Sequence, residues 1–341
     1  MRFQFIIILF MYTICLGQFG NDQSITKTGT TVAQFLKIGM DARSTSMGGA
    51  VAGQNGNLSG VYWNPASIAS FNGIGVQFGS YDWLVAMKYQ FAIIGIDLGA
   101  KGVLGLSIVN LSSPDDLVRT VSEPQGTGEK FSTNDLSASL TYSKMLTDHF
   151  SLGGSFKYIQ QNIWHSTAHT VAIDIGTLFQ TPFYGTRLGA SISNYGGKMK
   201  MDGRDQKISI DPDLDNQGNV EFVNAIYETE HFPLPLFFRV GVSGELIKKQ
   251  NLKLSYGIDA LHPNDNTEHL NIGLELNYRE ILFLRGGIPS FYKMDSIEGP
   301  TFGAGLNYHM TRTATLLKID YSFSSYGPLG DVERLSIGFN F

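Results

Sequence analysis

Residues 270–278 read LNIGLELNY, and this stretch decides the fold. Apolar side chains stand at every second position, and polar residues or glycine fill the positions between them. An alternation with a period of two places apolar groups on one face of an extended strand and polar groups on the other. The stretch therefore predicts a β-strand with one apolar and one polar face.

The same alternation recurs from Ile74 to the terminal Phe341. About fourteen such segments follow one another, and most are about 9 to 12 residues long, which suits tilted membrane strands better than the shorter strands of globular sheets. An even count is typical of single-chain bacterial barrels. The segments begin near residues 74, 88, 102, 134, 150, 169, 186, 235, 251, 268, 281, 300, 315 and 334.

The connections between segments differ in length in an ordered way. Those after the second, fourth, eighth and tenth segments are short, whereas those after the third, seventh, eleventh and thirteenth are long and include residues 113–133 and 196–233. Short and long connections therefore fall mostly at opposite ends, as in barrels with short periplasmic turns and long outer loops. We predict an all-β fold in which residues 74–341 form a transmembrane antiparallel barrel of the bacterial outer membrane, with lipid around it and both termini in the periplasm. The charged residues expected on the inner face are Arg239, Lys253, Asp259, Glu275, Lys318 and Asp320, since charge on the lipid face is costly.

Composition narrows the class of protein. Charged residues make up 16% of the 341 residues, and the net charge of -5 without basic clusters argues against nucleic-acid binding. Residues 1–18 carry Arg2 and an apolar run too short to span a bilayer as a helix, so they are interpreted as a signal peptide.

Residues 19–73 break the alternation and contain short helix-like pieces. A barrel of this size has an interior too wide for its own side chains to fill, so we expect this segment to form an N-terminal plug, or hatch, inside it. Pro65 forces Asn64 out of the helical region, and the Asn64 side chain can bond to backbone groups. Tyr62 and Trp63 supply apolar area with polar atoms for wedging against the wall. A simpler interpretation, compatible with the first, is that Asn-Pro caps a short helix at 65–70.

Three short motifs within residues 41–67 resemble the opening signature of the PorV/PorQ family, itself similar to FadL-type fourteen-stranded barrels. They are Asp41-Ala42-Arg43, the MGGA of Met47 to Ala50 with Gly48 and Gly49, and the YWNPAS of Tyr62 to Ser67. The resemblance implies a component of the type IX secretion system. Its partners would be the translocon, an attachment complex or the C-terminal domains of cargo, bound through the loops 113–133 and 196–233.

The alternative is a FadL-type transporter of hydrophobic small molecules. That alternative calls for a bulge or kink in the wall, which Gly95, Gly99, Gly102 and Gly105 could permit. No motif of an enzyme, a nucleotide site or a zinc site is present, so we predict no catalytic activity, no cofactor and no metal. The acidic stretch 211–218 departs from the EF-hand spacing, which leaves an irregular Ca²⁺ site as a lesser alternative.

Overall fold

The computed structural model describes residues 27–183, 185–212, 215, 222–293, 296–310 and 315–341. The predicted signal peptide lies outside these residues, as do the first residues of the predicted hatch and most of the acidic stretch 211–218. Among the described residues, no helix has the length and apolar character needed to span a bilayer.

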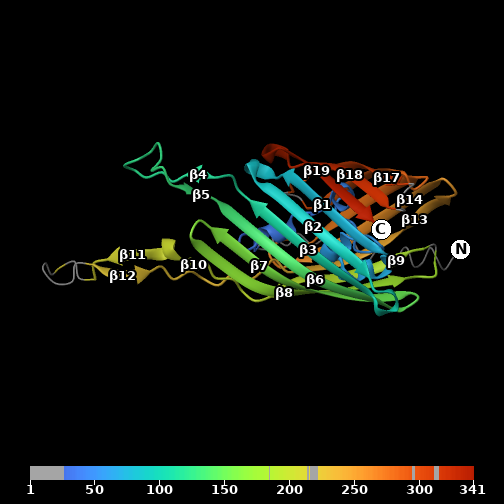
Figure 1. The fold of residues 1–341 in the computed structure, drawn as a ribbon, viewed down its shortest axis with the longest axis horizontal. Helices are drawn as coiled ribbons and strands as arrows, with labels where there is room; N and C mark the ends of the chain where they lie inside the picture. Colours follow the sequence, from blue (N-terminus) through green and yellow to red (C-terminus); the bar gives the residue numbers. More distant parts are fainter. Residues whose placement is uncertain (1–26, 184, 213–214, 216–221, 294–295, 311–314) are drawn as a thin grey trace.

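Fourteen antiparallel strands form a closed barrel (Figure 1). Each strand pairs with its neighbours along the chain, and the ring closes where the first strand pairs with the last, from Gly75 opposite Asn340 to Gly79 opposite Ser336. The predicted strand count and order are therefore confirmed. The strands are β1 (Ile74–Asp82), β2 (Lys88–Asp97), β3 (Val103–Ser112), β6 (Thr133–Thr147), β7 (Phe150–Ile163), β8 (Ser166–Gln180), β9 (Arg187–Gly196), β13 (Phe237–Lys249), β14 (Leu252–Pro263), β15 (His269–Tyr278), β16 (Leu282–Phe291), β17 (Thr301–His309), β18 (Leu316–Ser325) and β19 (Asp331–Asn340).

The alternation read from the sequence sets which side chains face outward. On β15, Leu274 is 46% exposed on the outer surface, whereas its neighbour Glu275 is 7% exposed on the inner side. An outer face of this kind, built from aliphatic and aromatic side chains, suits contact with hydrocarbon, because the charged groups are kept inside. Other strongly exposed outer residues are Leu106, Ile108, Leu140, Phe156, Ile173, Ile175, Leu284, Phe302 and Leu335.

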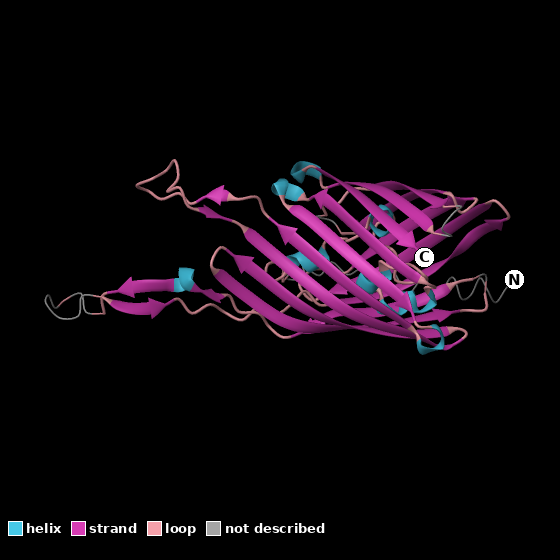
Figure 2. Ribbon diagram, viewed as in Figure 1, coloured by secondary structure: helices cyan, strands magenta, loops and turns pink. Residues whose placement is uncertain are grey.

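The two ends of the barrel differ. At one end, named here the short-turn end, every connection spans at most six residues, for example 148–149 and 250–251. At the other, the long-loop end, lie the long connections 113–132, 197–236 and 292–300. Two of these carry small hairpins that project beyond the barrel, namely β4 (Asp116–Leu117) with β5 (Lys130–Phe131), and β11 (Lys207–Ile210) with β12 (Val223–Ile226) (Figures 1 and 2). The predicted sorting is confirmed for the long connections after the third, seventh and eleventh strands, whereas the connection after the thirteenth strand, also predicted to be long, spans only residues 326–330. The remaining short elements at this end are η3 (Leu84–Ala86), β10 (Asp202–Gly203), η5 (Arg204–Gln206) and η6 (Gly327–Leu329), while η4 (Gly99–Lys101) lies in a short turn.

Residues 27–73 lie inside the barrel as a hatch of short helices and turns (Figure 2). The segment is too rich in glycine and serine for long helices, so each helix is one or two turns long. β1 follows at Ile74 without a linker. The hatch elements are η1 (Gln34–Lys37), α2 (Ala42–Ser46), α3 (Gly60–Trp63) and η2 (Pro65–Ser70).

The bulge or kink that glycines of the second and third strands could permit does not form. β2 and β3 pair without interruption from Lys88 opposite Ser112 to Asp97 opposite Val103. Gly99 and Gly102 instead make the turn between these strands, with φ of 64° and 104°, and Gly95 and Gly105 face the hatch. Irregular pairing occurs elsewhere, between β6 and β7, β8 and β9, β13 and β14, and β15 and β16.

Candidate functional site

The hatch crosses the lumen and contacts opposite walls. Helix α2 packs against β16, β17, β18 and β19, whereas η2 packs against β6, β7 and β8. The linking stretch from Met47 to Gly53 runs along β9 and β13–β16. The hatch therefore reaches across the lumen from one side of the wall to the other.

The motif residues predicted for the hatch come together at its centre. Asp41 caps α2, because its Oδ2 accepts from the backbone nitrogen of Ser44 at 3.0 Å. The other carboxylate oxygen of Asp41 accepts from Trp63 Nε1, also at 3.0 Å. One fully buried carboxylate thus joins the Asp-Ala-Arg motif to the Tyr-Trp-Asn-Pro motif.

The glycines of the MGGA motif permit a tight turn between these parts. Gly48 and Gly49 have φ of 64° and 73°, values that residues with a Cβ rarely adopt. A Cβ on Gly48 would lie 3.0 Å from the backbone of Ile288 and Pro289, and one on Gly49 would lie 3.4 Å from the Trp63 ring. Both positions therefore need glycine for backbone conformation and for space.

Asn64 both caps a short helix and attaches the hatch to its surroundings, as the two interpretations of the Asn-Pro pair expect. Its side-chain oxygen accepts from Ala66 N at 3.1 Å and so caps η2, which begins at Pro65. Its amide nitrogen donates to the carbonyl oxygens of Ala52 at 2.7 Å and Thr177 at 3.1 Å. Capping and wall attachment are therefore combined in one fully buried side chain.

Tyr62 holds the first helix of the hatch. Its hydroxyl lies 2.7 Å from the carbonyl oxygens of both Leu36 and Ile38 and can donate its hydrogen to either. Burial raises the pKa of the Tyr62 hydroxyl well above its usual value, so the group stays a neutral donor. Its ring meets the Trp63 indole edge to face, with centroids 5.0 Å apart.

Rows of glycine let the hatch backbone touch the wall. Gly257, Gly273 and Gly287 stand directly opposite one another on β14, β15 and β16. A Cβ at any of these positions would overlap the hatch backbone between Met47 and Ala50. Further directly paired glycines face the hatch in the same way, namely Gly189 with Gly241, Gly153 with Gly176, and Gly75 with Gly95 and Gly105. We call these sets the glycine rows.

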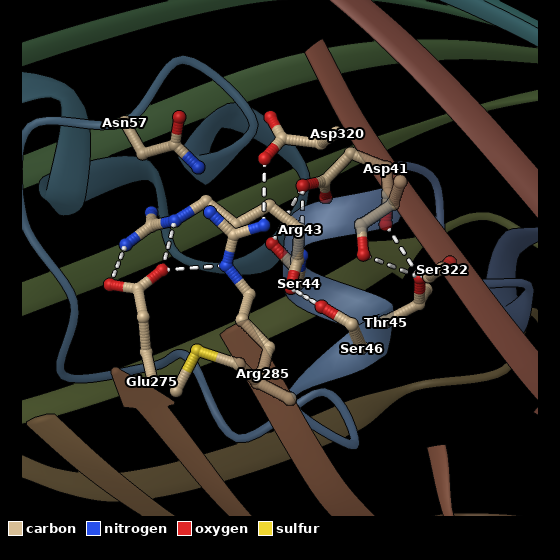
Figure 3. Close-up of polar contacts among 12 residues, drawn as sticks. Asp41, Arg43, Ser44, Thr45, Ser46, Asn57, Glu275, Arg285, Asp320 and Ser322 are labelled. Carbon is tan, nitrogen blue, oxygen red and sulfur yellow. Dashed lines mark hydrogen bonds and ion pairs between the residues drawn. The ribbon is translucent and has the colours of Figure 1, made fainter. Parts of the chain in front are cut away.

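A charged network fixes α2 to the wall (Figure 3). Arg43 donates from Nε and Nη2 to the two carboxylate oxygens of Glu275, each at 3.0 Å. Arg285 donates from Nε to Glu275 and from Nη1 to Asp320, both at 2.7 Å. Two guanidinium groups thus face two carboxylates, so the network has no net charge and its bonds have favourable geometry. Removing one member would leave a buried charge without its partner.

Two further carboxylates of the wall hold the hatch. Asp259 accepts from the backbone nitrogens of Val51 and Ala52, both at 2.9 Å. Asp265, in the loop after β14, accepts from Lys37 Nζ at 2.6 Å and from Thr31 at 2.5 Å. Burial alone would raise the pKa of the Asp265 carboxyl, but the hydrogen bonds from Lys37, Thr31 and Gln34 outweigh burial and lower it below its usual value.

A cavity of about 840 Å³ lies above the hatch toward the long-loop end. Its floor consists of η1, the Gly48–Gly49 turn, Tyr62 and Trp63, and its walls come from the long-loop halves of the strands. Arg239 reaches its base from β13, with its guanidinium carbon 4.8 Å from the centroid of the Trp63 ring. Arg239 is 9% exposed, and its Nε and Nη1 find no hydrogen-bond partner among the described residues. Other lining residues are Leu111, Gln161, Asn194, Phe237, Leu261, His269, Asn271 and Tyr326.

The sequence singled out residues of the hatch but not the wall residues that bind them. Arg239, Asp259, Glu275 and Asp320 were expected only as inward charges, and their bonds to the hatch or its neighbours were not expected. Arg285 was not singled out at all. A signal for the glycine rows does exist, because Gly241, Gly257, Gly273, Gly287 and Gly303 recur every 14 to 16 residues, about once per strand.

The predicted binding loops do not line the floor of the cavity. The described parts of these two loops carry the hairpins β4–β5 and β11–β12, which project away from the barrel (Figure 1). Met201 is the lining residue that the second loop contributes among those described. Among the described residues, no cluster of three or more His, Cys, Asp or Glu side chains could hold a metal ion.

Comparisons of the sequence with known families and curated proteins find no match. No protein-family model matches the chain, and no curated protein matches it. The PorV/PorQ part of the resemblance therefore stays a prediction.

Solved structures match over most of the chain. A Pseudomonas aeruginosa FadL homologue superposes with a TM-score of 0.52 at 10% identity, covering 92% of this chain and 99% of its own. The Pseudomonas putida toluene transporter TodX gives a TM-score of 0.55 at 13% identity, and the CymD monoaromatic hydrocarbon channel gives 0.51 at 11%; each covers 89% of this chain and 98% of its own. At such low identity the likeness establishes architecture alone, and the chain has the FadL-like fold of a fourteen-stranded barrel with short N-terminal helices.

Proposed function

We propose that this protein is an outer-membrane transport barrel that admits a small, mainly apolar molecule into the cavity above the hatch. The cavity is the observation that carries this proposal. Its volume of about 840 Å³ falls in the range of small-molecule sites, about 300 to 1,000 Å³. The barrels with a similar fold that are described as a toluene transporter and a monoaromatic hydrocarbon channel support it.

The polar groups of the cavity favour a ligand with one polar end. Two guanidinium nitrogens of Arg239 lie buried at its base without a hydrogen-bond partner among the described residues. A purely hydrocarbon ligand would leave these buried donors unpaired, which is unfavourable. Trp63 and Phe237 offer aromatic surface near this arginine for the apolar part of the ligand.

Quenching of Trp63 fluorescence tests this function, in a protein whose Trp83 and Trp164 are replaced by Phe. The probes are 2-bromododecanoic acid, whose bromine lies next to the carboxylate, and 1-bromododecane, added to the protein in detergent. We expect saturable quenching by the acid, and Arg239→Met should weaken it about tenfold or more because a charged hydrogen bond is lost. Arg119→Met, in an exposed loop, is the control. If neither probe quenches Trp63 saturably, the proposal is refuted.

The orientation follows from the same proposal. Bacterial barrels carry short periplasmic turns and long outer loops, so the long-loop end would face outward and both termini inward. Thiol labelling of intact cells tests this arrangement with single cysteines at Val121 and Asn251. Only the cysteine at position 121 should react with an impermeant reagent.

Protein docking at the long loops is a second candidate function. The observation that favours it is the pair of hairpins β4–β5 and β11–β12, which stand clear of the barrel (Figure 1). The PorV/PorQ resemblance would make the partners a type IX translocon, an attachment complex or cargo C-terminal domains. Affinity isolation from outer membranes with a C-terminal tag tests it, because specific recovery of such proteins is expected only if the loops bind protein.

A further inference from the structure

The β11–β12 hairpin forms a two-stranded ribbon outside the barrel. Its register runs from Lys207 opposite Ile226 to Ile210 opposite Val223. It pairs with no third strand among the described residues. Both of its long edges therefore present unpaired backbone groups, which is the arrangement that other strands can join.

The ribbon has one apolar face. Residues opposite each other in an antiparallel pair share a face, and alternate residues along a strand do so as well. The face made by Ile208, Ile210, Val223, Ala225 and Tyr227 is named here the ribbon face. Ile210, Val223 and Tyr227 are 43%, 45% and 63% exposed. The opposite face carries Lys207, Ser209 and Asn224, with Ile226 as its apolar member.

Such a ribbon is poorly suited to remain uncovered. A lone two-stranded hairpin is marginally stable in water, and a third strand or other packing on its apolar face stabilises it. The barrel does not supply that cover, because the ribbon projects past the strand ends (Figures 1 and 2). A partner from outside the chain would therefore bury surface that the fold leaves exposed.

The charge of the ribbon indicates which partner fits. Residues 205–230 contain seven acidic residues and one basic residue, Lys207. Like charges oppose association with a second copy of the same ribbon and with an anionic lipid surface. A basic protein segment is attracted, because its charge is opposite to that of the ribbon.

We propose that the ribbon docks an extended segment of another protein that carries apolar residues flanked by lysine or arginine. The segment pairs along a free edge and packs its apolar side chains on the ribbon face, as in strand addition. This inference rests on the second proposed function, protein docking, and is independent of transport.

A photo-reactive amino acid placed in turn at positions 210, 209 and 121 of the full-length protein tests the inference in intact cells. Position 210 lies on the ribbon face, 209 lies on the opposite face, and 121 lies in the other long loop. We expect adducts with another polypeptide that are stronger from 210 than from 209. Adducts from 210 only with lipopolysaccharide or a second copy overturn the inference. Protein adducts from 121 without any from 210 also overturn it and leave docking in place, whereas none from either loop refutes both.

A defined probe gives the second measurement. A fluorescein-labelled peptide of alternating valine and lysine is titrated against the protein in detergent. Ile210→Lys and Ser209→Lys add the same charge on opposite faces of β11. Ile210→Lys should weaken binding about tenfold more than Ser209→Lys, because it removes burial of one aliphatic side chain. Equal weakening by the two variants would mean that charge alone holds the peptide and that the ribbon face is not used.

Discussion

The glycine rows make a prediction that two neighbouring residues can test. Gly287 faces the hatch, and a Cβ there would lie 2.8 Å from Gly48 Cα and nearer still to the Gly48 nitrogen. Gly286, the preceding residue on β16, has the opposite orientation, and a Cβ there would find no atom closer than 3.9 Å. Gly287→Ala and Gly286→Ala therefore add the same methyl group to the same strand with opposite consequences for the hatch.

The expected size of the effect follows from these distances. Carbon atoms in contact prefer about 3.5 to 4.0 Å, so the Met47–Gly48 backbone would have to move by about 1 Å. Overpacking of this kind costs about 1–3 kcal/mol. Alanine offsets about 0.5–1 kcal/mol of that cost through a smaller loss of chain entropy, and Gly286→Ala has only this gain. The two variants should therefore differ by about 2 kcal/mol.

Thermal unfolding in detergent, followed by tryptophan fluorescence, measures this difference. At about 2 °C per kcal/mol for a large domain, Gly287→Ala should unfold about 4 °C below Gly286→Ala. The hatch should also become more sensitive to protease in the first variant, because Gly48 can no longer seat against β16. Equal melting temperatures and equal cleavage would refute direct contact between the hatch backbone and the strand.

Three further outcomes are expected. Asn64→Ala removes a cap and two hydrogen bonds, and we expect a loss of about 2–3 kcal/mol in the free energy of unfolding, against about 0.5 kcal/mol or less for the exposed Asn72→Ala. Glu275→Gln removes the carboxylate that two buried guanidinium groups share, so the free energy of unfolding should fall by about 3 kcal/mol. Glu268→Gln, at an exposed site, should change the melting temperature little. Asp265 has a lowered pKa in the folded protein, so its contribution is complete above the ordinary carboxyl pKa of about 3.9 and is lost as the pH falls through the lower folded value. The melting temperature of Asp265→Asn should accordingly lie below that of the wild type at pH 7, and the gap should close toward pH 2.

The barrel could be predicted because its signal is local. Each strand shows its alternation in about ten consecutive residues, as Leu270 to Tyr278 do, and loop lengths are also read directly from the chain. The hatch could be predicted for a similar reason, since Pro65 and the Gly48–Gly49 pair interrupt the pattern within a few residues. Neither inference needs knowledge of which strands meet in space.

The anchors of the hatch could not be predicted because they depend on register. The sequence suggests that Glu275 faces the lumen, but Arg43 lies 232 residues away in the chain, and only the shear of the closed barrel brings the two together. The absence of a kink at Gly95 and Gly105 could not be predicted for the same reason. A glycine within a strand can mark a bulge or the close approach of another backbone, and the choice between them requires knowing that Gly75, Gly95 and Gly105 stand in one row against the hatch.

The two sides of the wall hold the hatch by different means, and this difference bears on the proposed transport. On the side of β14, β15 and β18, carboxylates and arginines bind α2 and the Met47–Ala52 turn. On the side of β1, β2 and β3, the hatch residues Phe35, Leu36, Ile38 and Val61 share an apolar cluster with wall residues such as Tyr89 and Val109. The hydroxyls of Tyr81 and Tyr89 also donate to the carbonyl oxygens of Gly39 at 2.8 Å and Ile38 at 3.3 Å. Directional bonds are lost when they are displaced by about 1 Å, whereas apolar packing tolerates sliding. A ligand that reaches the floor of the cavity should therefore displace η1 before α2, because a single wall carboxylate, Asp265, binds η1, whereas Glu275 and the arginines around it bind α2. Crosslinking a cysteine pair at Leu36 and Val109 should abolish passage of a ligand, whereas a pair at Thr45 and Ser322, whose hydroxyls already lie 3.0 Å apart, should permit it.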